Sequence, residues 1–160
     1  MSEIDKLIEV AKLTSKHIIE DLQQEHIPTM LILAPKGKII APVKLETEED
    51  KENFKFIATS LLHQLNAYAY AFISEAWMSS LPFDSPTGRD LLNGTKRVTE
   101  LPLDDKEEIL CIHVVKKETY HKEVSAKIKY KTDNSRYLDK WEETEEYIEP
   151  PLGRLTVWSW

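Results

Sequence analysis

Two groups of side chains have types and spacings suited to catalysis. Glu75 lies between Ile73 and Trp77 in an apolar run, and a carboxyl group buried there would have a raised pKa, which suits a general acid or base. Cys111 and His113 are two residues apart, so on a strand they share a face, with Cβ atoms roughly 7 Å apart. Glu75, Cys111 and His113 are therefore the candidate catalytic residues of a small cofactor-independent, hydrolase-like enzyme, with His113 activating the thiol.

Each of these residues also has a simpler structural interpretation. Glu75 can form an ion pair near the end of its strand, and Cys111 can be a small buried thiol beside a hydrogen-bonded core histidine. Cys111 and His113 could supply two zinc ligands, but no second chelating pair follows at a metal-binding spacing. HExxH, GxSxG, P-loop and dinucleotide motifs are missing from the sequence, which has only 4 glycines. The sequence predicts no cofactor and no metal, and it leaves enzymatic activity open.

Aromatic residues gather towards the end of the chain. Trp141 and Tyr147 flank a run containing four glutamates, and Trp158 and Trp160 share one face of an expected final strand. Aromatic side chains are favoured both in cores and at interface hot spots. Both interpretations stay open, and as interface residues these four predict a protein partner or a second copy of the chain.

Lysines concentrate over 116–131, together with Tyr120 and Tyr130. Lysines beside aromatic rings can bind single-stranded nucleic acid. Two glutamates interrupt this basic stretch, and the whole chain has a net charge of -7, so a solvated strand face is favoured over nucleic-acid binding. The lysines and the later glutamate run could also attract each other between copies.

The pattern of apolar residues predicts the elements that position these side chains. Helices are expected over 3–24, capped by Ser2 with Asp5, and over 47–66, capped by Thr47. Strands are expected over 29–34, 38–45, 67–78, 108–118, 124–131 and 154–160, with 136–148 either a strand or a short helix. Pro42 removes a backbone donor, which indicates an edge strand. The 79–106 segment lacks periodicity and is expected to be a long irregular loop, acting as a lid or a partner-binding loop.

The 160 residues are expected to form a single α+β domain spanning 1–160, with an antiparallel-rich sheet of five to six strands and two main helices packed on one face. The single cysteine and the acidic N-terminus predict a cytoplasmic protein without a secretory signal, and the longest apolar run is too short to span a membrane. The function predicted first is a non-catalytic binding or assembly module that self-associates. The small enzyme built on Glu75, Cys111 and His113 is the alternative.

Overall fold

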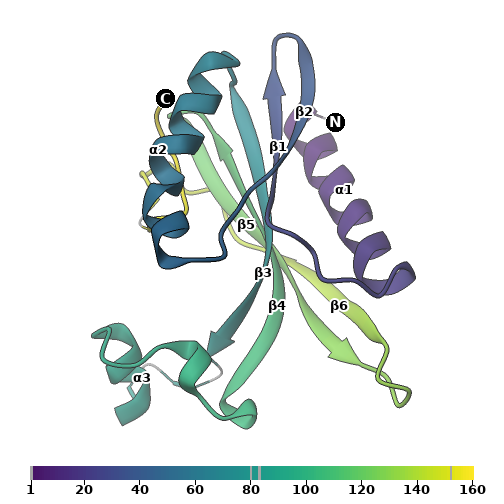
Figure 1. Cartoon of the computed structure of the whole chain (residues 1–160), viewed down its shortest axis with the longest axis vertical. Coiled ribbons are helices and arrows are strands. Elements are labelled where there is room, and N and C mark those ends of the chain that lie inside the picture. Colours follow the sequence, from purple (N-terminus) through teal and green to yellow (C-terminus); the bar gives the residue numbers. More distant parts are fainter. Residues whose placement is uncertain (1, 80, 83, 152) are drawn as a thin grey trace.

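A computed structural model describes residues 2–79, 81–82, 84–151 and 153–160. Six antiparallel strands form one sheet in the order β2-β1-β3-β4-β5-β6 (Figure 1). The elements in chain order are α1 (Glu3–Lys16), the π-helical turn η1 (His17–Asp21), β1 (Thr29–Ala34), β2 (Gly37–Pro42), α2 (Glu48–Gln64), β3 (Ala69–Ser79), α3 (Pro86–Leu92), the 3-10 turns η2 (Val98–Glu100) and η3 (Leu103–Asp105), β4 (Lys106–Lys116), β5 (Tyr120–Tyr130) and β6 (Arg136–Glu143). The expected α+β class and antiparallel sheet are confirmed.

Both long helices begin where their caps were predicted. The Ser2 hydroxyl accepts a hydrogen bond from the Asp5 amide at 3.1 Å, and the Asp5 carboxylate accepts one from the Ser2 amide. Thr47 and Asp50 form the same reciprocal capping box at the start of α2. These bonds satisfy amides that have no partner within the helix, so they define where each helix starts.

The two helices lie on opposite faces of the sheet, which corrects the expectation that they share one (Figure 1). Side chains alternate along β1: Leu31 and Leu33 pack with α1, whereas Met30 and Ile32 pack with α2. The same alternation along β3 gives the sheet two apolar faces. Each face has to be covered, so one helix is needed on each side. We refer to these faces as the α1 face and the α2 face.

The C-terminal segment differs from its prediction. Residues 154–160 form no strand; they begin with a turn at 154–155 and pack against the core on the α2 face. The Tyr70 hydroxyl donates to the Val157 carbonyl at 2.9 Å and accepts from the Val157 amide at 2.8 Å, and the Trp160 indole donates to the Ala67 carbonyl. A side-chain hydroxyl thus satisfies backbone groups that a neighbouring strand would otherwise pair.

The expected irregular segment over 79–106 contains local structure. Pro86 opens the short helix α3, and its cap Ser85 accepts from the Gly88 amide at 3.0 Å. Gly88 lies so close to Pro82 that an added Cβ would fall 2.1 Å from the Pro82 carbonyl oxygen. Ser80 and Phe83 of this segment lie outside the described residues.

Candidate functional site

Glu75 holds an ion pair on the α1 face. It lies opposite Leu110, a residue of the core beneath α1. One carboxylate oxygen accepts from the Arg136 guanidinium of β6, and the other accepts from the His26 amide at 2.5 Å. The Glu75 and Arg136 side chains are 14% and 15% exposed. Both oxygens of Glu75 are thus bonded within the protein, as in the simpler interpretation of this residue as an ion-pair partner.

A cavity of about 410 Å³ lies beside this ion pair. Trp77 and Tyr130 line it together with Glu108, and the Tyr130 hydroxyl donates to Glu108 at 2.7 Å. The Arg136 guanidinium is 3.9 Å from the same carboxylate. Arg136 therefore pairs with both Glu75 and Glu108, and these ion pairs connect β6 to β3 and β4.

Cys111 and His113 face the other side of the sheet. They lie opposite Ser74 and Phe72, and Phe72 belongs to the core beneath α2. Burial raises the pKa of the Cys111 thiol to about 12, so the residue is a neutral thiol at pH 7, a poor nucleophile. Glu75 is therefore separated from this pair by the thickness of the sheet, and the structure does not bring the three candidate catalytic residues together.

His113 pairs with His121 of β5 and not with Cys111, the partner expected from the sequence. Its Nε2 atom lies 3.1 Å from Nδ1 of His121 on β5. Burial, and to a smaller extent the adjacent His121, lower the pKa of His113 to about 4. His113 is thus a neutral, hydrogen-bonded histidine at pH 7. Within the described part of the chain, no group of three or more His, Cys, Asp or Glu side chains could hold a metal ion.

The four aromatic residues predicted at an interface divide between the two faces. Trp141 packs against the core under α1, with the Lys12 ammonium 5.8 Å from its ring centroid. Trp158 and Trp160 pack against the core under α2. Tyr147 stacks on the His121 ring at 5.3 Å and is 48% exposed. The three tryptophans therefore contribute to internal packing, and only Tyr147 has half its surface in solvent.

The lysines of the β4–β5 hairpin do not form one basic surface. Lys127 pairs with Glu107 at 3.4 Å, and Lys129 pairs with Asp139 at 3.6 Å. Lys122 lies on the opposite face, where it pairs with Glu143 at 3.4 Å. Acidic partners therefore reduce the positive charge on both faces.

The outer edge of β6 is covered by other parts of the chain. The Gln23 side chain accepts from the Arg136 amide at 2.6 Å and donates to the Arg136 carbonyl at 2.8 Å. Glu20 accepts from the Leu138 amide at 3.0 Å. A β-bulge between Ala126 and Ile128 of β5 shifts the pairing with β6. Side chains and a bulge are both devices that stop an edge strand from pairing with another chain.

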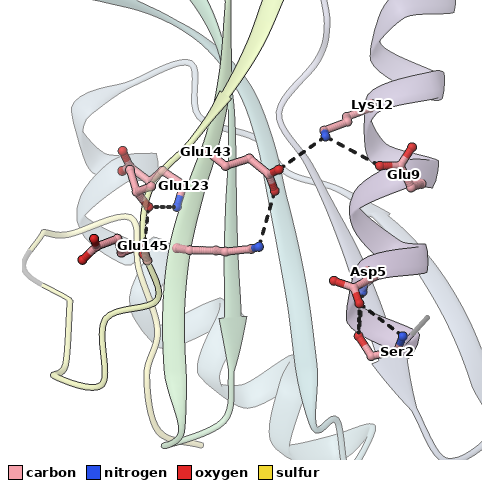
Figure 2. Close-up of polar contacts among 9 residues, drawn as sticks. Ser2, Asp5, Glu9, Lys12, Glu123, Glu143 and Glu145 are labelled. Atoms are coloured by element: carbon pink, nitrogen blue, oxygen red, sulfur yellow. Dashed lines mark hydrogen bonds and ion pairs between the residues drawn. The ribbon is translucent and has the colours of Figure 1, made fainter.

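Glu143, at the end of β6, is also tied to its surroundings. Lys12 of α1 lies 3.9 Å from the Glu143 carboxylate and 3.6 Å from Glu9 (Figure 2). This ion-pair chain links the helix to the edge strand. Together with the bonds from Glu20 and Gln23, it connects α1, η1 and the residues after η1 to β6.

In the part of the chain that the structure describes, the outer edge of β2 has no such cover. The Leu33 carbonyl accepts from Tyr68 on the β3 side, so Leu33 and its opposite residue Lys38 turn their backbone groups away from each other. By the same alternation, Ile40 presents its amide and carbonyl to the outside. Among the described residues, no strand or side chain pairs with these groups. Ile40 is also 70% exposed.

Comparison with known proteins finds no match: no family model, no curated protein and no solved structure is detectably similar to this chain. In the described residues, no helix is long and apolar enough to cross a membrane. The function therefore has to be argued from the molecule's own surfaces. Of these, the β2 edge carries unpaired backbone groups beside an exposed apolar side chain.

Proposed function

We propose that this chain is a non-catalytic assembly module whose copies associate through the outer edge of β2. The observation that carries the proposal is the unpaired edge at Lys38 and Ile40, next to the 70% exposed Ile40 side chain. An exposed strand edge is a ready template for another strand, and most homo-oligomers pair identical surfaces about a two-fold axis.

The two-fold pairing with the best fit centres on Ile40. There, Ile40 lies opposite its own copy and exchanges both backbone hydrogen bonds with it. Ile39 lies opposite Ala41 on the α2 face, so apolar side chains meet on both faces of the joined sheet. Lys38 donates to the Pro42 carbonyl, while Pro42 has no amide to return. The strand is short and each copy lacks one donor, so we expect a weak, reversible dimer with a micromolar dissociation constant.

The enzyme alternative gains no comparable support. Glu75 lies on the opposite face from Cys111 and His113, and the thiol is neutral.

A protein with a single cysteine has no need of an oxidising compartment, so we propose that the assembly forms in the cytoplasm.

Sedimentation or light scattering over a range of micromolar concentrations tests the proposal. We expect the mass to rise with concentration towards twice the 18.6 kDa of one chain. Ile40→Glu, which places two like charges opposite each other, should remain a monomer. Ile148→Glu is the matched control, because Ile148 is 80% exposed and lies outside β2; it should associate like the unmodified protein. A mass that stays at one chain throughout, or equal association of both variants, would rule the proposal out.

A further inference from the structure

The cavity beside the Glu75–Arg136 ion pair has aromatic side chains in its lining. Its volume of about 410 Å³ lies within the range of small-molecule sites, about 300–1,000 Å³. Trp77 and Tyr130 both line it, and Tyr130 is 53% exposed, so solvent reaches the cavity. The face of an aromatic ring carries partial negative charge and attracts cations. The two rings therefore offer a surface for the hydrocarbon part of a ligand that also carries a positive charge.

Negative charges outnumber positive ones in this lining. It contains three carboxylates, those of Glu25, Glu75 and Glu108, and one guanidinium, that of Arg136. The Lys106 ammonium lies outside the lining, 4.5 Å from the centroid of the Trp77 ring. With Lys106 included, three negative charges still oppose two positive ones. The charge of the cavity therefore favours a cationic occupant over an anionic one.

Two of the three carboxylates have oxygens without a hydrogen-bond donor. Among the described residues, Glu25 forms no hydrogen bond and no ion pair. One oxygen of Glu108 accepts from the Tyr130 hydroxyl at 2.7 Å. The other has no donor among the described residues and lies 3.9 Å from the Arg136 guanidinium. An ammonium group has three donors and no acceptor, so it can bond to both carboxylates.

We infer that this cavity binds a small primary alkylammonium ion, with its nitrogen at Glu25 and Glu108 and its hydrocarbon part against Trp77 and Tyr130. A carboxylate or phosphate ligand would be repelled by the glutamates, and a neutral alcohol would leave their charge unbalanced. The inference does not rest on the proposed association, because the cavity is lined from β3 to β6 and β2 is the opposite edge of the sheet.

Titration with n-butylammonium at neutral pH and constant ionic strength tests this inference. Calorimetry measures the affinity, and the NMR signal of the Trp77 indole reports binding at the cavity. We expect saturable binding that shifts this signal, with 1-butanol about tenfold weaker, methylammonium also weaker, and no effect of butyrate or sodium chloride. Equal affinities for n-butylammonium and 1-butanol, equal affinities for n-butylammonium and methylammonium, or an unchanged Trp77 signal would each overturn the inference.

Variants then test the two carboxylates. Glu108→Gln removes the charge but keeps an acceptor for the Tyr130 hydroxyl, and it should weaken n-butylammonium binding about tenfold. Glu25→Gln, at an exposed side chain, should weaken it about two- to fivefold. Glu52→Gln is the matched control, because Glu52 is exposed and lies outside the lining; it should bind like the unmodified protein. Circular dichroism checks that each variant is folded. Unchanged affinity in folded Glu25→Gln and Glu108→Gln, or an equal loss in Glu52→Gln, would contradict the inference.

Discussion

The two edge strands of the sheet differ in whether their outward backbone groups have hydrogen-bond partners. At β6, Gln23 and Glu20 bond to the outward backbone groups of Arg136 and Leu138, and a bulge interrupts the pairing. At β2, none of the described residues pairs with the outward groups of Lys38 and Ile40, and the central side chains are apolar. The same chain closes one edge and leaves the other open. A partner strand is therefore expected at β2, and β6 is protected from the same event.

The largest effect is expected from breaking the ion pair that anchors β6. Arg136→Met leaves the Glu75 carboxylate largely buried without its guanidinium, which should lower the free energy of unfolding by about 3 kcal/mol. Urea denaturation measures this loss. The double variant Glu75→Gln with Arg136→Met should recover part of it, since no unpaired charge remains. A loss in the double variant equal to that of Arg136→Met alone would mean that the pairing itself contributes little.

The next effect concerns the open edge itself. Ile40→Pro removes the central outward amide but keeps the bonds between β2 and β1, because the Ile40 amide points away from β1. The dimer should lose the hydrogen bonds exchanged at its centre, and its dissociation constant should rise at least tenfold. Sedimentation measures the constant, while thermal unfolding of the monomer should change little. An unchanged dissociation constant would show that the dimer interface does not lie at β2.

A smaller effect should appear when the closed edge is opened. Gln23→Ala removes the partners of the Arg136 amide and carbonyl, so the Arg136 amide should exchange with solvent faster, with about 1 kcal/mol less protection. In the unmodified protein, this amide should be protected at every protein concentration. The amides of Lys38 and Ile40 should become protected only as concentration rises. Equal, concentration-independent exchange at both edges would remove the distinction between them.

The smallest effect is the response of association to salt. In the pairing about Ile40, Lys36 of one copy lies opposite Lys44 of the other, and each chain has a net charge of -7. Salt screens this repulsion, so added sodium chloride should strengthen the dimer about twofold. If the hairpin lysines and the glutamate run instead drive association between copies, salt should weaken it. The sign of the salt effect thus separates the two interfaces.

Local signals in the sequence predicted most of the elements. The caps at Ser2 and Thr47 define where α1 and α2 begin, and Pro42 indicated an edge strand, which is confirmed by the position of β2. The first helix was expected to continue to residue 24, yet it ends in the π-helical turn η1. This difference matters, because the turn brings Glu20 and Gln23 to β6, more than a hundred residues further along the chain.

Sequence alone determined the caps, the turns and the alternation of apolar residues, since each depends on residues only a few positions apart. Tertiary structure decided on which face each helix lies, that Glu75 and the pair Cys111–His113 are separated by the sheet, and which edge is covered. Alternation shows that a strand has two apolar faces but not which helix packs on each. Likewise, the position of a carboxylate in the sequence does not reveal its partner. Arg136 reaches Glu75 only because β6 and the segment after η1 fold against the same face.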